Sequence, residues 1–438
     1  MTWIVWMNKT IIALAVASLT VAATSFTAAN AAAVYDQDGT SLDVYGRVQS
    51  VLYSGKQSGV LDDKATTITT GRLGLDMRST ITGDIAGFAA AEWDVADGND
   101  NESFNARTLW VGLDFGDAGL VKFGKFEPAM KYAISQTDIF EDFGGVGFTG
   151  GDDRRRGVVQ YEWAGMGFNV LASYVFAQKA EHLDGAYIFG SDPDGAISAD
   201  ETVDLNYTVS FAAGYTSPDV LFGPIDIRFG YEKGEFANKD LGLNTFSLDG
   251  LGGSNSGALL GLAQRHDNTI SAISDSSIQY DSYDQFAVGL SWGTMDVGPY
   301  FGAMYQQRSF DVVSTAKITR TGGAAAAVSS LGIDELEVSG YEFVAAYTFE
   351  NGVSARTGYL ARKYDAGIVG EFEAKVIPVL VAWQVTPQFD VWAEARFDAG
   401  TDNSETTIDD KQITIAYDDL FGTNFSENVY SAGIRYQF

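Results

Sequence analysis

The residue types that usually carry catalysis are scarce in this chain. It has no cysteine, which excludes a thiol nucleophile and a cysteine-bound metal, and its two histidines are His182 and His266. Both histidines fall in long polar segments between strand-like runs. A hydrolase of the Ser–His type that is built on strands would need its histidine on a strand. We therefore expect no enzymatic activity.

One acidic segment has part of the spacing of a calcium-binding loop. Residues 190–201 place Asp192, Asp194 and Glu201 at the third, fifth and twelfth positions of an EF-hand loop. The first position, normally Asp, is Gly190, and no helical pattern flanks the segment. A solvated acidic turn is the favoured interpretation, with weak Ca²⁺ or Mg²⁺ binding by these carboxylates as the alternative. No other cofactor is expected.

The chain is strongly acidic. It holds 58 acidic and 28 basic residues, a formal net charge of −30. At that charge we do not expect nucleic acid as a partner. The excess of carboxylates keeps long polar loops soluble or attracts cations to the surface, and salt weakens the second effect.

Strand-like runs with a period of two residues fill most of the chain. Residues 341–349 and 389–397 place apolar side chains at odd positions and polar ones between them. We expect sixteen such strands, at about 43–54, 67–80, 85–95, 105–114, 119–126, 157–163, 167–178, 203–216, 224–235, 282–292, 296–309, 336–349, 353–364, 371–385, 388–398 and 428–438.

The spacers between these runs alternate between short and long. The short ones are two- or three-residue turns, whereas the long ones are 127–156, 179–202, 236–281, 311–335 and 399–427. Tight turns at one rim and long loops at the other are typical of a membrane β-barrel. An even strand number puts both termini at the turn side, and about sixteen strands enclose an aqueous channel. The mean hydropathy of −0.03 fits a wall with one apolar and one wet face.

The two ends of the sequence support this fold. Lys9, an apolar run at 11–17 and Ala29-Asn30-Ala31 predict a secretory signal peptide over 1–31, with a membrane anchor as the alternative. Residues 32–438 are expected to form one domain. The last eleven residues alternate up to Phe438, as in a barrel strand or in an edge strand of a soluble sandwich. Six tryptophans are expected in aromatic girdles near strand ends: Trp93, Trp110, Trp163, Trp292, Trp383 and Trp392.

Several short motifs resemble those of the general, non-specific outer-membrane porins of Gram-negative bacteria. Asp142-Phe143-Gly144-Gly145, with Asp138 ahead of it, resembles that family's Pro-Glu-Phe-Gly-Gly loop, and Glu141 stands where Pro is frequent. The other matching motifs are Ala33 to Gly39, Val44-Tyr45-Gly46-Arg47, Arg72-Leu73-Gly74 and Tyr436-Gln437-Phe438. The resemblance implies a sixteen-stranded antiparallel transmembrane β-barrel, all-β, with a constriction loop at about 127–156 folded into the lumen.

The resemblance also implies a charged constriction. Asp138 and Asp142 match the acidic loop, and the opposing basic residues would be Arg47, Arg72, Arg107, Arg154 and Arg156. Opposed charges across a narrow lumen produce a transverse field that aligns polar solutes. In the alternative interpretation each arginine is an ordinary solvated lumen residue.

The expected function is passive diffusion of ions and small hydrophilic solutes through a homotrimer in the outer-membrane lipid. Glu102 matches the residue that latches neighbouring subunits in the family, and Lys125 matches its basic partner. The alternatives are a substrate-selective sugar or anion porin, and a structural or adhesive barrel with an incidental pore.

Overall fold

The computed structural model describes residues 32–54, 64–96, 104–148, 154–181, 203–237, 245–247, 269–320, 328–329, 334–365, 371–401, 404–408, 411–415 and 425–438. The predicted signal peptide, Glu102, both histidines and the acidic segment 190–201 lie outside these ranges. Within them, no helix is long and apolar enough to cross a membrane.

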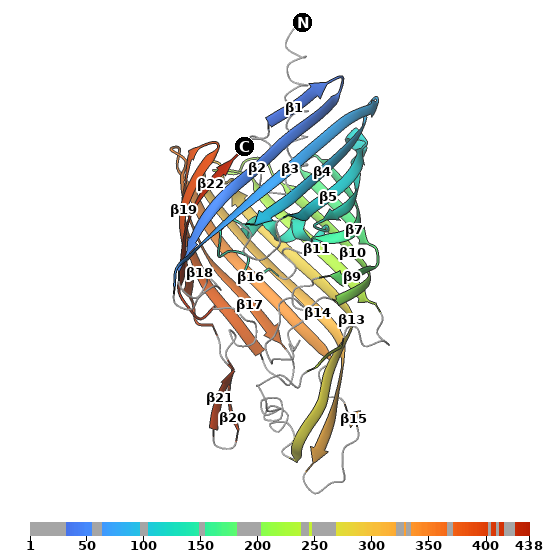
Figure 1. Ribbon diagram of the computed structural model, residues 1–438, viewed down its shortest axis with the longest axis vertical. Helices are drawn as coiled ribbons and strands as arrows, with labels where there is room; N and C mark the ends of the chain where they lie inside the picture. Colours follow the sequence, from blue (N-terminus) through green and yellow to red (C-terminus); the bar gives the residue numbers. More distant parts are fainter. Residues whose placement is uncertain are drawn as a thin grey trace.

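The described strands form one closed antiparallel barrel, as predicted (Figure 1). Its sixteen wall strands are β2 (Thr40–Tyr53), β3 (Thr66–Thr82), β4 (Ile85–Ala96), β5 (Asn105–Asp114), β6 (Leu120–Phe126), β7 (Arg155–Gly165), β8 (Phe168–Val175), β10 (Val203–Thr216), β11 (Ile225–Phe236), β13 (Ile270–Gly293), β14 (Gly298–Arg320), β16 (Glu335–Thr348), β17 (Val353–Asp365), β18 (Glu371–Thr386), β19 (Phe389–Asp398) and β22 (Val429–Gln437). The barrel closes where β22 pairs with both β19 and β2.

Short elements complete the described structure. The short strands are β1 (Ala32–Gln37), β9 (Gln178–Glu181), β12 (Thr245–Ser247), β15 (Val328–Ser329), β20 (Ser404–Ile408) and β21 (Lys411–Ile415). The helical turns are η3 (Gly116–Ala118), α2 (Met130–Ile134) and η4 (Ser135–Thr137). β1 folds back on β2 through a tight turn at Asp38 and Gly39, both of which have positive φ.

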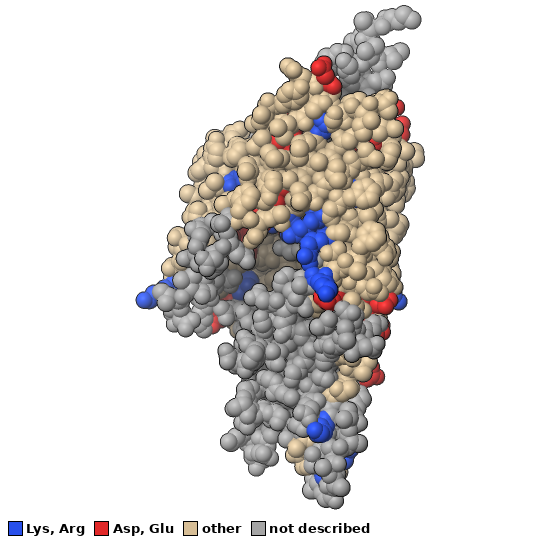
Figure 2. Space-filling model, turned by 45° about the vertical axis from the view of Figure 1, so that its right-hand side comes forward, with Lys and Arg blue, Asp and Glu red and all other residues tan. Residues whose placement is uncertain are grey.

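The burial pattern along each strand is the reverse of that in a soluble protein. On β10, Thr208 and Ser210 are 0% and 2% exposed, whereas Val209 and Phe211 between them are 46% and 44% exposed. The polar face therefore points into the barrel and the apolar face points outward. Figure 2 shows the same arrangement from outside: the barrel wall is almost uncharged, and Lys and Arg gather where the surface is hollowed. A closed hydrogen-bond ladder with an apolar exterior suits a hydrocarbon surrounding.

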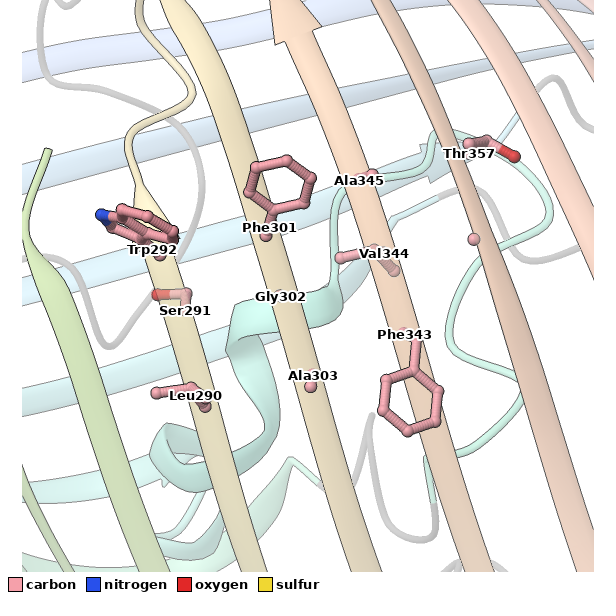
Figure 3. Close-up of a pocket in the computed structure, with 11 residues that line it drawn as sticks. Leu290, Ser291, Trp292, Phe301, Gly302, Ala303, Phe343, Val344, Ala345 and Thr357 are labelled. Carbon is pink, nitrogen blue, oxygen red and sulfur yellow. The ribbon is translucent and has the colours of Figure 1, made fainter. Parts of the chain in front are cut away.

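A shallow hollow of about 470 Å³ lies on this outer face, across β13, β14, β16 and β17. Trp292, Phe301 and Phe343 frame it around Ala303, and the loop helix α2 lies behind the sheet (Figure 3). Phe301 and Phe343 are exposed and point away from the lumen. The hollow is thus a feature of the apolar exterior and not a path through the barrel.

The structure corrects the predicted extent of one hairpin. We expected loops at 236–281 and 311–335, but β13 and β14 remain paired as far as Ile270 and Arg320. This two-stranded ribbon projects beyond the barrel rim (Figure 1). Ser274 and Ser276 interrupt the apolar positions of this ribbon, and its pairing shifts register between Ser274 and Ser277, so the alternation that marks the wall strands is weaker there.

The tryptophans are also only partly where we expected them. Trp163, Trp292 and Trp383 lie on the outer face near the turn ends of β7, β13 and β18, as an aromatic girdle requires. Trp110 and Trp392 instead face the lumen, where each contacts a basic side chain. Trp392 is an even-numbered residue of β19, like Glu394 and Arg396. The alternation of the strand therefore already places it on the face that points into the lumen.

Candidate functional site

The chain after β6 turns into the barrel and forms a loop against the inner wall (Figure 1). Met130, Ala133 and Ile134 of α2 pack with Ala287 and Met304 on the wall strands. Glycines make this close approach possible: a Cβ at Gly289 would lie 2.4 Å from the carbonyl oxygen of Ala133. Residues 127–148 of the predicted constriction loop therefore form a packed structure that narrows the lumen.

Polar wall residues hold the loop backbone. The Glu394 carboxylate on β19 accepts hydrogen bonds from the amides of Glu141, Asp142 and Phe143 at 3.0, 2.9 and 2.9 Å. Glu342 on β16 accepts one from the Gly147 amide at 2.9 Å. These carboxylates satisfy loop amides that would otherwise be buried without partners, and charge-assisted hydrogen bonds of this kind are strong.

Arginines hold loop carbonyls in the same way. Arg356 on β17 donates to the Ile139 carbonyl at 2.5 Å, and Arg362 donates to the Phe148 carbonyl. Arg228 on β11 donates to the Tyr132 carbonyl at 3.1 Å. Basic and acidic wall residues therefore form hydrogen bonds to the loop backbone along most of its described length.

Asp142 lies in the loop as predicted, but its carboxylate is turned toward the wall. It accepts hydrogen bonds from Tyr53 at 2.9 Å, Trp392 at 2.8 Å and Ser431 at 2.5 Å. Its charge is thus used to fasten the loop to β2, β19 and β22. The motif identified the residue but not the direction of its side chain.

Glu141, the position that departs from the family motif, pairs its side-chain carboxylate with a wall arginine. Arg435 on β22 donates to both carboxylate oxygens of Glu141, at 2.7 and 3.2 Å, and to Asp390 at 3.2 Å. Burial alone would raise the pKa of the Glu141 carboxyl. The charges of Arg435, Arg356 and Arg47, with the hydrogen bonds from Arg435, hold that pKa below its usual value.

Three of the predicted basic residues come together on the first strands. Arg47 and Arg72 lie directly opposite each other on β2 and β3. Arg72 and Arg107 both contact Glu92 and Asp94 of β4, with nitrogen–oxygen distances of 2.9 to 3.6 Å. Opposed like charges repel, so the β4 carboxylates stabilise this arrangement. Arg47 lies within electrostatic reach of Arg435 and Glu141, which connects the basic group to the loop.

The arginines after the loop do not follow the prediction. Arg154 pairs with Glu127 at 2.7 Å, at the base of the loop. Arg156 is exposed and donates to the Lys179 carbonyl, so its expected place in the constriction is wrong. Gly157, with φ of +65°, lies in an irregular part of the β6–β7 pairing and reverses the side-chain alternation there. Arg155 therefore faces inward and is buried with Glu232 at 2.8 Å.

The remaining predicted residues differ in their surroundings. Asp138 keeps 45% of its side chain exposed inside the barrel, with Lys131 at 3.4 Å. Lys125 donates to the Ala106 carbonyl of its own chain at 2.7 Å, and its predicted partner Glu102 lies outside the described residues. Asp192, Asp194 and Glu201 lie outside them too. Among the residues the structure describes, no three metal-ligand side chains lie together.

Sequence reasoning missed several charged residues of the site: Glu92, Asp94, Glu141, Arg155, Arg356, Glu394 and Arg435. A signal was present for Glu394 and Arg435, because both occupy polar positions of alternating strands. Strand parity assigns a residue to the lumen, but it does not say which partner it meets there.

The comparisons with known proteins agree with this architecture. A model of the Gram-negative porin family matches residues 13–438. Outer membrane protein F of Serratia marcescens is 31% identical over 225 residues, 48% of this chain and 57% of that protein. Outer membrane porin OmpD of Salmonella typhimurium strain SL1344 is 33% identical over 207 residues, 44% of this chain and 52% of that one. The chain thus spans about half the length of the curated relatives it matches.

A solved structure is similar over nearly the whole barrel. The Salmonella typhi OmpF complex with daunomycin superposes with a TM-score of 0.61 at 18% identity, covering 93% of this chain and 100% of that one. At this identity the likeness shows the fold alone. The family match, in contrast, extends over almost the entire sequence, and with the inward loop it leads to one conclusion: this chain belongs to the Gram-negative porin family.

Proposed function

We propose that the protein is a porin of the bacterial outer membrane, through which ions and small hydrophilic solutes diffuse passively. The observation that carries this proposal is the exposure of charged groups inside a closed barrel. Asp94 on the inner face of β4 and Asp138 in the inward loop both keep 45% of their side chains accessible. Water must reach them there, and a water-filled lumen beside a charged constriction conducts ions.

Conductance of the purified protein in a planar lipid bilayer tests the proposal. We expect stepwise, ohmic currents in KCl and a reversal potential that indicates mild cation preference at low salt. Liposome swelling should be set by solute size more than by solute chemistry. Insertion without conductance would instead support a structural or adhesive barrel.

The lumen offers little support for a sugar-selective channel at the loop. Such a channel would present aromatic side chains to the solute. Phe143 of the loop and Trp392 of β19 lie inside the barrel, but they are only 3% and 6% exposed. Asp138 in the same loop is 45% exposed, so diffusion shaped by charge is the better supported function.

Asp138→Asn should shift the selectivity of the channel toward anions. Asp138 is the accessible loop carboxylate, so its loss removes one negative charge from water-filled space. At 0.1 M salt, where the Debye length is about 10 Å, one unit charge acting over about 10 Å of water changes the cation-to-anion permeability ratio about twofold. The measurement is the reversal potential across a KCl gradient near 0.1 M, repeated near 1 M, where the Debye length falls to about 3 Å and the difference should vanish.

Asp142→Asn is the matched control for that experiment. It removes the same charge four residues away, but from a carboxylate held by Tyr53, Trp392 and Ser431. We expect a noisier open channel, because the amide replaces an acceptor oxygen with a donor, and a smaller change of selectivity. Equal reversal-potential shifts for the two variants would contradict the different placement of their side chains.

We further propose a homotrimer, in which Glu102 of one subunit contacts Lys125 of the next. Glu102→Ala and Lys125→Ala should each lower the temperature at which trimers dissociate during electrophoresis. If the two side chains form one interaction, the double variant should be no worse than the more affected single variant. Additive losses would mean that the residues do not touch. Lys125→Ala also removes the bond to Ala106, so its single effect should be the larger.

The proposed activity needs no catalytic group and no cofactor. We propose that the chain is not an enzyme and that the acidic segment 190–201 binds Ca²⁺ or Mg²⁺ weakly at most. A family of passive channels and the incomplete ligand spacing of that segment support this view.

A further inference from the structure

We propose that Arg435 is a specificity-determining residue of the channel, which cancels the charge of the loop carboxylate Glu141 and fixes it to the last strand. This inference rests on the proposed porin function. It adds to the basic wall a residue from β22 that faces the first strands across the closing seam of the barrel. It also leaves Asp138 as the loop carboxylate that acts on passing ions.

The contact geometry makes Arg435 a bridge between three parts of the site. Two guanidinium nitrogens meet the two oxygens of Glu141 at 2.7 and 3.2 Å, and Nε meets Asp390 at 3.2 Å. A bidentate pair has a defined direction as well as a strong attraction. Asp390 lies directly opposite Arg435 on β19, so the neighbouring strand orients the guanidinium before the loop reaches it.

The surroundings keep this bridge in place. The side chains of Arg435, Glu141 and Asp390 are 13%, 18% and 12% exposed, so solvent screens the pair weakly. The guanidinium carbon lies 5.2 Å from the centre of the Trp392 ring, within the range of a cation–π interaction. Trp392 in turn donates to Asp142 in the loop. Arg435 and its aromatic neighbour therefore hold consecutive loop residues.

The charge balance gives the expected effect on selectivity. Glu141, Asp390 and Arg435 together carry one net negative charge, and Arg435 supplies the positive charge that contacts both carboxylates. Without Arg435 the set would carry two negative charges beside Arg47. Without Glu141, Arg435 would be balanced by Asp390 alone. The two changes should therefore move ion preference in opposite directions.

Reversal potentials of four channels in a KCl gradient near 0.1 M test this inference. Arg435→Gln should raise the cation-to-anion permeability ratio about twofold, the factor for one unit charge acting over about 10 Å of water when 0.1 M salt screens it with a Debye length of about 10 Å. Glu141→Gln should lower it by a similar factor. The double variant Glu141→Gln with Arg435→Gln has the same net charge as the unaltered protein and should return to its ratio. Frequent brief closures should accompany every variant that breaks the bridge, since the loop has lost a tether.

Arg78→Gln is the matched control. Arg78 also pairs with a carboxylate, Asp114 at 2.7 Å, but it is 48% exposed near the turn end of β3 and has no described contact with the loop. The cation-to-anion permeability ratio of the Arg78→Gln channel should change much less. Electrophoretic mobility before and after heating shows whether each variant forms a folded barrel. Glu141→Gln alters the loop and no wall strand, so it serves as the test if Arg435→Gln fails to assemble.

The outcomes distinguish the role of Arg435 from the porin function itself. If the unaltered protein conducts and both single variants keep its reversal potential, the assignment of Arg435 is overturned and the porin function stands. Shifts of the same sign in both single variants would also overturn it, because the charge balance requires opposite signs. If the unaltered protein inserts but does not conduct, the proposed function fails and this inference fails with it.

Discussion

Deletion of Tyr436 to Phe438 should abolish assembly of the protein in the outer membrane. These residues complete the seam between β22 and β2, where Phe438 and Gly46 exchange two backbone hydrogen bonds of 2.9 and 3.0 Å. Gln437 also donates its amide to the Gln388 carbonyl on the other side. Without them, backbone groups at the seam have no partner in hydrocarbon, at a cost of several kcal/mol each. Membrane fractionation and heat-dependent electrophoretic mobility would measure the loss.

Phe438→Ala separates closure of the barrel from the contribution of the terminal ring. The substitution keeps both backbone hydrogen bonds to Gly46 and removes a ring that packs against that glycine. We expect a lower yield of folded barrel but not its disappearance. A folded, correctly located deletion variant would show that the seam does not depend on these residues. A complete loss in Phe438→Ala would show that the aromatic side chain, and not the hydrogen-bond ladder, is what assembly requires.

The barrel could be predicted from the sequence because each wall strand meets two solvents. Residues on one face contact water and those on the other contact hydrocarbon, so a strand such as β19 alternates Val391, Ala393 and Ala395 with Asp390 and Glu394. That pattern is local and needs no knowledge of the fold. The ribbon formed by 270–281 and 311–320 was missed because serines and register shifts interrupt its alternation beyond the wall.

The positions of individual charges were harder to predict. A single irregularity at Gly157 reverses the strand alternation, so Arg155 faces inward where Arg154 and Arg156 were expected. The pair of Glu141 and Arg435 joins residues 294 positions apart, and only the closed barrel brings them together. The inward loop itself was expected from resemblance to a family and not from any local pattern.

Glu394→Ala should release the tip of the constriction loop. The Glu394 carboxylate accepts three consecutive loop amides, more than any other described wall residue. A hydrogen bond to a charged group contributes about 1.5–3 kcal/mol, and the three amides would be left unsatisfied in a buried place. We expect frequent partial closures and strong open-channel noise in single-channel recordings, because the freed tip can move across the lumen.

Two further substitutions should increase the closure frequency by smaller amounts. One oxygen of Glu394 accepts the amides of both Glu141 and Asp142. Glu394→Gln keeps an amide oxygen that can accept these two hydrogen bonds, so closures should increase less than in Glu394→Ala. Glu342→Ala removes a wall carboxylate that holds the single amide of Gly147, and it should have the smallest effect. The expected order of closure frequency is therefore Glu394→Ala, then Glu394→Gln, then Glu342→Ala. Recordings of Glu394→Ala as quiet as those of the unaltered channel would mean that Asp142 and Arg356 suffice to hold the tip, and that the three amide contacts do not limit its motion.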